Sequence, residues 1–210
     1  TLSVKNKKQA LGTVQQMMRN PGSVIYVRQQ EPAGLGHAVW CARHLAQSEP
    51  VAVLLADDLI LGKSCLGEML SAYAGGNMVA VMDVPQDETQ YYGIVTPGKD
   101  DGKLVQVTGL VEKPTPEQAQ SNIAVVGRYI IEPGVFKQLD RQDQGTDGEI
   151  QLTDSLARQI GVAPFNGYRF SGERFDCGSK IGFLQANVAF ALQRNELNQR
   201  LHGWLAERIR

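Results

Sequence analysis

The run Val51-Ala52-Val53-Leu54-Leu55-Ala56 is apolar without alternation, and two carboxylates, Asp57 and Asp58, follow it at once. A short continuous apolar run predicts a strand that is buried on both faces of a parallel sheet. In open α/β sheets, ligands bind just beyond the carboxyl ends of such strands. We therefore expect Asp57 and Asp58 to lie where this kind of fold places its chemistry. The alternative is that the pair starts a turn or caps the helix after Gly62.

Composition limits the class of protein. The chain has 210 residues, of which 42% are hydrophobic and 20% charged, with a formal net charge of -1. This length is enough for one domain with a sizeable core. The nearly balanced charge gives no basic field for nucleic acid or anionic lipid, and no apolar run approaches the roughly 18 residues of a membrane span. We expect neither nucleic acid nor membrane as a partner.

The compartment is inferred from the cysteines and the first residues. Cys41, Cys65 and Cys177 lie far apart in the sequence, which is typical of a reducing compartment and argues against a disulfide framework or a zinc site. Residues 1–10 carry lysines and no apolar core, unlike a secretory signal. The expected location is the cytoplasm.

Helix and strand patterns alternate along the chain, which predicts an α/β sheet with crossover helices and a more β-rich insertion near residues 91–131. Helices are expected over residues 2–18, 36–45, 66–74, 135–140, 149–160, 181–194 and 197–210. Besides the apolar run, strands are expected over residues 23–29, 78–84, 91–96, 104–111, 123–131 and 165–170.

A glycine-containing loop, Gly34-Leu35-Gly36, joins an expected strand to a helix. Glycines let a backbone approach a ligand closely, and a helix N-terminus offers free N–H groups. The loop therefore suits the recognition of a flat polar ring, with Gln29 as a further donor and acceptor. The alternative is a plain turn and helix start.

Two other segments carry charge at the ends of strands. Glu112 and Lys113 are adjacent, so alternation prevents both from being buried in one core. One can accept hydrogen bonds from hydroxyl groups while the other reaches a phosphate, or both can be solvated on an edge strand. Asp176 and Lys180 lie between a strand and a helix: Asp176 is a candidate metal ligand, and Lys180 is either a phosphate contact or a surface lysine.

Together these segments resemble the bacterial UTP–glucose-1-phosphate uridylyltransferases, or UDP-glucose pyrophosphorylases, a family within the sugar-1-phosphate nucleotidyltransferases. The resemblance rests on strings that occur in the family's order between residues 24 and 195: VRQQEPAGLGHAVWCA, EPVAVLLADD, YYGIVTP, GLVEKP, SNIAVVGRYI, GEIQLTD and RFDCGSKIGFLQA. It implies a Rossmann-like three-layer α/β/α sandwich with a mixed, mainly parallel sheet (the nucleotidyltransferase fold), in a single catalytic domain over residues 1–210. Residues 197–210 form a C-terminal helix that is a candidate for an interface.

The resemblance also implies roles for matching positions. Gln29, Gly34 and Gly36 would read the uracil, Asp57 would hold Mg²⁺ with Asp176 as a second candidate, and Lys113 would contact the phosphates. Lys180 is a candidate substrate-binding residue. The sugar pocket would be formed by Gly93, Glu112, Asn122, Gly127 and Glu149.

The implied reaction is uridylyl transfer from UTP to glucose 1-phosphate, giving UDP-glucose and pyrophosphate by Mg²⁺-assisted in-line attack without a covalent intermediate. The nucleophilic phosphate is already anionic at neutral pH, which fits the lack of an obvious catalytic triad. Alternatives are a nucleotidyltransferase for another sugar phosphate or nucleotide, and a non-catalytic sugar-nucleotide-binding paralogue or regulatory subunit. A homodimer or homotetramer is expected by resemblance.

The chain departs from the family at its start. The family opens with a strand and a glycine-rich loop, G-x-G-T-R, followed by a lysine-bearing segment, P-K-E-M-L-P, and neither string is present. That loop cradles the triphosphate with backbone N–H groups. We therefore expect the chain to be part of a longer protein that supplies the N-terminal β–α units, and to show no turnover by itself.

Overall fold

The structure is a computed structural model that describes residues 8–145 and 148–208. The chain divides into two units, Thr1–Gln30 and Glu31–Arg210, which we describe separately. The first unit contains helix α1 (Lys8–Met17), so the start of the helix expected over residues 2–18 lies outside the described residues. The strand expected over residues 23–29 does not form there. Ile25 and Tyr26 are exposed, and a β-strand needs a paired neighbour to satisfy its backbone.

The described part of the second unit contains a sheet of six strands in the order β1-β6-β3-β7-β5-β4. Its strands are β1 (Val51–Leu54), β3 (Asn77–Asp83), β4 (Gly93–Asp100), β5 (Leu104–Glu112), β6 (Ile123–Ile131) and β7 (Phe165–Arg169).

The sheet is mixed, as expected, but its described pairs are not mainly parallel. Only β3 and β7 pair in parallel; β6 runs antiparallel to both β1 and β3, and β4, β5 and β7 pair antiparallel. The reason is that the β-rich stretch expected as an insertion supplies β6, which lies inside the sheet between two strands of the opposite direction. The prediction of a mainly parallel sheet was wrong.

Strand β1 also differs from its prediction. It pairs with β6, and within the described sheet it has no second neighbour. Its residues alternate between half-buried and exposed, and Leu54 is 51% exposed. The apolar run therefore forms the expected strand, but at a sheet edge rather than buried on both faces.

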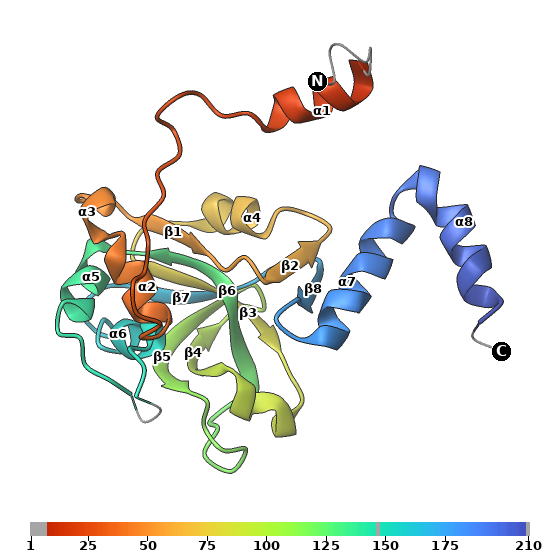
Figure 1. The fold of residues 1–210 in the computed structure, drawn as a ribbon. Coiled ribbons are helices and arrows are strands. Elements are labelled where there is room, and N and C mark those ends of the chain that lie inside the picture. The colour runs from red at the N-terminus through yellow and green to blue at the C-terminus, as the bar shows by residue number, and fades with distance from the viewer. Residues whose placement is uncertain (1–7, 146–147, 209–210) are drawn as a thin grey trace. The chain divides into compact units, whose positions relative to one another are not determined.

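Helices cover both faces of the sheet, which confirms the three-layer architecture (Figure 1). On β3, Val79 and Val81 face the cluster that includes α2 (Leu35–Cys41), α5 (Pro133–Leu139) and α6 (Leu152–Ala157). Met78 and Ala80 face the opposite cluster, which includes Cys65 and Met69 of α4 (Cys65–Ala72). Alternation along one central strand thus supplies both cores.

Short elements complete the unit. The helix expected over residues 36–45 forms as α2 and α3 (Arg43–Ala46), with Ala42 between them. A 3-10 helix, η1 (Gln86–Tyr91), precedes β4. Strands β2 (Asp58–Leu61) and β8 (Glu173–Asp176) pair antiparallel in a second sheet that was not predicted, and α7 (Lys180–Leu192) and α8 (Asn195–Ala206) follow it. Among residues 8–145 and 148–208, no helix is long and apolar enough to cross a bilayer.

Candidate active site

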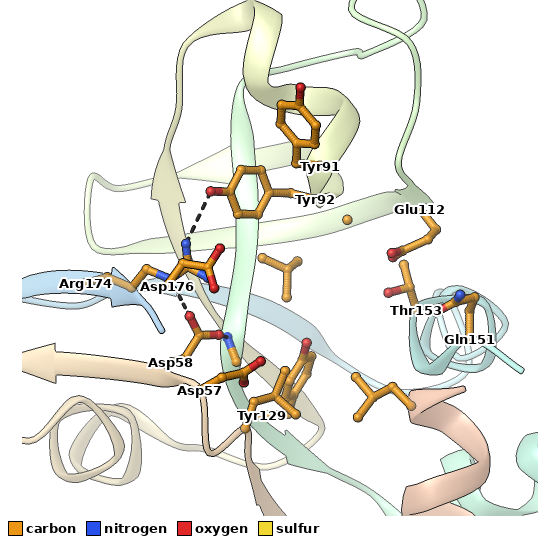
Figure 2. A pocket seen from close by; sticks show the side chains of 15 residues that line it. Asp57, Asp58, Tyr91, Tyr92, Glu112, Tyr129, Gln151, Thr153, Arg174 and Asp176 are labelled. Atoms are coloured by element: carbon orange, nitrogen blue, oxygen red, sulfur yellow. Dashed lines mark hydrogen bonds and ion pairs between the residues drawn. The ribbon is translucent and has the colours of Figure 1, made fainter. Parts of the chain in front are cut away.

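A pocket in the second unit gathers acidic and hydroxyl side chains from distant parts of the chain (Figure 2). In Figure 2, Asp57, Asp58, Arg174 and Asp176 lie on one side, which we call the aspartate side. Glu112, Gln151 and Thr153 lie on the other, which we call the Glu112 side. The remaining lining residues are Leu35, Leu55, Tyr91, Tyr92, Gly93, Val125, Gly127 and Tyr129.

The two-stranded sheet brings Asp57 and Asp176 together. Asp58 is the register partner of Asp176, and the N–H of Cys177 donates to the carbonyl of Asp57 at 2.8 Å. A Cβ placed on Gly178 would lie 3.0 Å from Asp176 Oδ1 and 3.3 Å from Asp57 Oδ2. Both carboxylates therefore face the same small volume.

Behind these carboxylates, Asp58 is buried and ion-paired. Its side chain is 6% exposed, Arg174 Nε donates to its Oδ1, and the N–H of Gly127 donates to its Oδ2 at 2.8 Å. Burial lowers the pKa of Arg174, but the hydrogen bond and negative charge of Asp58 outweigh burial and hold that pKa above its ordinary value. Arg174 therefore keeps its positive charge beside Asp58.

On the opposite side, the polar groups of Glu112 and Thr153 converge over Gly93. Gly93 and Glu112 are register partners in the β4–β5 pair. A Cβ on Gly93 would lie 3.2 Å from Glu112 Oε2 and 3.3 Å from Thr153 Oγ1. Tyr129 is a further hydroxyl of the pocket; burial, with the charges of Glu112 and Asp58, raises its pKa, so the hydroxyl keeps its proton. A side chain at Gly93 would crowd Glu112 and Thr153, so glycine leaves both polar groups open to the pocket.

Lys113 follows Glu112 in a left-handed conformation, with φ 45°. Its N–H donates to the carbonyl of Tyr92 at 2.9 Å, and its Nζ lies 3.9 Å from Glu112 Oε1. A lysine with positive φ is uncommon, and such strain is concentrated at functional sites. The lysine is exposed and lies outside the set of lining residues.

The glycines of the loop make room for another part of the protein. The N–H of Gly36 donates to the carbonyl of Ile150, and the N–H of Ile150 donates to the carbonyl of Ala33, both at 2.8 Å. A Cβ on Gly36 would lie 2.7 Å from the Ile150 oxygen, and one on Gly34, at φ 100°, would lie 2.8 Å from Glu149 Cβ. These hydrogen bonds hold Ile150 outside the helix, and Gln151 is extended, so α6 begins at Leu152 rather than near residue 149 as predicted.

The structure therefore brings together part of the predicted site: Asp57, Gly93, Glu112, Gly127 and Asp176. Gly34, Gly36 and Glu149 lie in the paired segments beside the pocket. Asn122 is outside the lining set and donates to the carbonyl of Val84 at 3.2 Å, and Lys180 is exposed at the start of α7. Gln29 belongs to the first unit. The roles of all these residues stay predictions.

Sequence reasoning missed several residues of the pocket. Arg174 is two residues before Asp176, so on a strand both side chains share one face; that spacing was the available signal. Thr153 and Gln151 were within a quoted string but were given no role. No local pattern marks Tyr129 or the pairing of Asp58 with Arg174.

The residues of the pocket fit a divalent cation whose coordination shell would be completed by oxygens of the substrate. Within the described ranges, no group of three or more His, Cys, Asp or Glu side chains could hold a metal ion. Mg²⁺, however, is usually bound by one or two carboxylates together with phosphate oxygens and waters. Asp57 and Asp176, which converge beside Gly178, supply two carboxylates of that kind.

A three-layer α/β/α sandwich whose pocket holds Asp57, Asp176 and Glu112 is the arrangement expected of a nucleotidyltransferase. The sequence matches the family model described as nucleotidyl transferase over residues 2–192. The chain is 47% identical over 208 residues to a UTP–glucose-1-phosphate uridylyltransferase of Komagataeibacter xylinus, covering 98% of this chain and 71% of that protein. It is 40% identical over 203 residues to the Bacillus subtilis (strain 168) protein of the same name, covering 95% and 69%.

Comparison with solved structures supports the same family. A UDP-glucose pyrophosphorylase complexed with UDP-glucose superposes with a TM-score of 0.83 at 36% identity, covering 90% of this chain and 74% of that one. A UTP-bound UGPase from Acinetobacter baumannii gives a TM-score of 0.87 at 35% identity, covering 98% and 73%. The chain belongs to the UTP–glucose-1-phosphate uridylyltransferase family, which confirms the resemblance and the fold class expected from its sequence.

Proposed function

We propose that this protein transfers a uridylyl group from UTP to glucose 1-phosphate, releasing pyrophosphate and forming UDP-glucose. One observation carries the proposal: the carboxylates of Asp57 and Asp176 converge in the same pocket as the Glu112 side. Transfer needs a cation site for phosphates next to a polar site for a sugar, and the side chains of this pocket suit both tasks. The names of the relatives and of the UDP-glucose and UTP complexes support this choice of substrates.

The chemistry requires alignment more than proton transfer. A phosphate oxygen of glucose 1-phosphate would attack the α-phosphorus of UTP, forming one P–O bond as the bond to the pyrophosphate oxygen breaks. The attacking phosphate is anionic at neutral pH because its second pKa is about 6, so no side chain must act as a base. The barrier lies in bringing two polyanions together in line.

The residues of the pocket suit that task. Asp57 and Asp176 would hold Mg²⁺, which when bound would neutralise charge on the phosphates. On the Glu112 side, Glu112 accepts hydrogen bonds from sugar hydroxyls, while Thr153 can donate or accept. Lys113, on the turn after Glu112, would reach the sugar phosphate as a mobile point charge.

We also propose a cytoplasmic location and a homodimer or homotetramer. The three cysteines are free, which supports a reducing compartment. Leu197 and Trp204, on the last helix, are 38% and 50% exposed, which supports a role for that helix in self-association.

The test is pyrophosphate release from UTP and glucose 1-phosphate in the presence of Mg²⁺, by a protein in which the family's N-terminal glycine-rich loop precedes these residues. We expect release that needs both substrates and is lost in Asp57→Asn. Other sugar phosphates and nucleoside triphosphates in the same assay define the specificity. Binding of UDP-glucose without turnover would favour the sugar-nucleotide-binding alternative, and turnover only with another pair of substrates would contradict the assignment of UTP and glucose.

A further inference from the structure

The ion pair between Asp58 and Arg174 is buried behind the pocket, and its members are 116 residues apart in the sequence. The side chains are 6% and 11% exposed, against 22–56% for the members of the Arg169 pairs elsewhere in the unit. Burying two charges is costly, and an apolar pair of the same size is often as stable. Stability alone is therefore a weak reason for an ion pair at this place.

The pair lies behind the two carboxylates of the proposed cation site and is connected to the strands that carry both. Asp58 follows Asp57 in the chain and faces Asp176 across the β2–β8 sheet. Arg174 and Asp176 are two apart on β8, so they share a face of that strand. Like charges directly opposite each other on a sheet are unfavourable. Arg174 places a positive charge against Asp58, which offsets the negative charge that Asp58 presents to Asp176.

The backbone around Asp57 is also held on both sides. Arg128 Nη1 donates to the carbonyl of Leu55 at 3.0 Å, and its Nη2 donates to the carbonyl of Asp58. The N–H of Gly127 binds the Asp58 carboxylate. The turn that carries Asp57 is thus fixed to β6, and the Asp58 side chain ties it to β8, the strand that carries Asp176.

Arg174 continues this connection toward the Glu112 side. Its Nη1 donates to the Tyr92 hydroxyl at 3.2 Å, and its guanidinium lies 5.6 Å from the centre of the Tyr92 ring. The carbonyl of Tyr92 accepts the N–H of Lys113. One guanidinium therefore contacts both Asp58, on the aspartate side, and Tyr92, whose carbonyl is bonded to the residue after Glu112 (Figure 2).

We propose that Asp58 and Arg174 are positioning residues, which hold Asp57 and Asp176 at the separation needed to share one divalent cation. The inference rests on the proposed function, because it takes these two carboxylates as the cation ligands. Groups that orient metal ligands from behind typically change metal affinity 10–100-fold when they are replaced.

The test measures Mn²⁺ binding by electron paramagnetic resonance, with Mn²⁺ alone and at a temperature at which circular dichroism shows every variant folded. We expect Asp58→Asn to raise the Kd for Mn²⁺ about 10–100-fold. Asp100→Asn is the matched control, because it neutralises a carboxylate that accepts from Arg169 at 2.9 Å, outside the pocket. Its Kd for Mn²⁺ should equal that of the unmodified protein.

The remaining outcomes separate the two proposals. If Asp57→Asn abolishes Mn²⁺ binding while Asp58→Asn leaves it unchanged, the positioning role is wrong and the proposed function stands. If Asp57→Asn itself leaves the affinity unchanged, both are wrong. If Asp58→Asn fails to fold, the double variant Asp58→Asn/Arg174→Gln replaces it in the test, because it buries no unpaired charge. We expect the double variant to bind Mn²⁺ at least tenfold more weakly. An unaltered affinity would overturn the proposal.

Discussion

Asp58 and Asp176 are register partners in the β2–β8 sheet, so Asp57, the residue before Asp58, lies beside the end of β8. The hydrogen bond from the N–H of Cys177 to the carbonyl of Asp57 fixes this arrangement. The paired carboxylates of the pocket are thus a consequence of strand pairing and do not depend on long, flexible side chains.

Asp57→Asn should reduce pyrophosphate release about 100-fold or more, because a cation site supplies several kcal/mol of transition-state stabilisation. Asp57 is exposed, so its substitution should change the free energy of unfolding little. A pyrophosphate-release assay and urea denaturation on the same preparation check the two halves of this prediction. Normal turnover by the variant would exclude Asp57 as an essential ligand.

Gly127→Ala should destabilise the protein by about 1–3 kcal/mol, as overpacking does. A Cβ at this position would overlap Asp58 Oδ2 and lie 2.7 Å from Leu55 Cβ. The free energy of unfolding from urea titration measures the effect. Gly203→Ala, in helix α8 with nothing within 4 Å of the added carbon, is the control and should be neutral or stabilising. Equal effects of the two substitutions would show that the contact with Asp58 is unimportant.

Lys113→Ala should weaken binding of glucose 1-phosphate about tenfold or more, since hydrogen bonds to charged groups contribute about 1.5–3 kcal/mol. Binding of free glucose or uridine should change much less, which equilibrium dialysis of the separate ligands can establish. Lys137→Ala, at the end of α5 and away from the pocket, is the control. A uniform loss for all ligands upon Lys113→Ala would argue against a phosphate contact.

Ser171→Ala should lower the free energy of unfolding at pH 7 by about 1 kcal/mol. The Ser171 side chain and N–H both donate to Glu68 and hold the pKa of that carboxyl below its ordinary value of 4.5. Stability from a depressed carboxyl pKa is fully present above the ordinary value and is lost as the pH falls through the depressed one. The difference between the two proteins should therefore shrink below pH 4.5 in denaturation curves.

Ser71→Ala provides the comparison for this pH dependence. Ser71 lies on α4, the helix that carries Glu68. Its hydroxyl donates to the carbonyl of Gly67 at 2.9 Å, and this carbonyl does not titrate. Its effect on the free energy of unfolding should be the same at every pH. A pH-independent effect of Ser171→Ala would contradict the role assigned to its bond with Glu68.

Local patterns in the sequence predict the parts of this fold that depend on neighbouring residues. The run that ends at Asp57 is a strand followed by a turn, as its apolar pattern indicates. Its place at an edge and its antiparallel pairing depend on β6. In the sequence, strands β2 to β5 separate β6 from this run. Strands β2 and β8 have four residues each, which is too short for alternation to stand out.

The residues of the candidate site also fall into two groups: those that a local sequence pattern marks and those that depend on distant contacts. Glu112 and Asp176 are polar residues at strand ends, so position in the pattern marks them. Arg174 becomes significant only through its contact with Asp58, and no local signal connects residues so far apart. Gly127 was expected to line the sugar pocket, and it does line the pocket, but its lack of a side chain is also needed for its bond to Asp58.

The most direct test of the central claim is a crystal structure of the full chain with UDP-glucose and Mn²⁺, in which anomalous scattering locates the metal. The account predicts an anomalous peak between Asp57 and Asp176, with glucose hydroxyls within hydrogen-bond distance of Glu112. A metal peak away from both aspartates, or a sugar bound outside the pocket that contains Gly93 and Glu112, would contradict it.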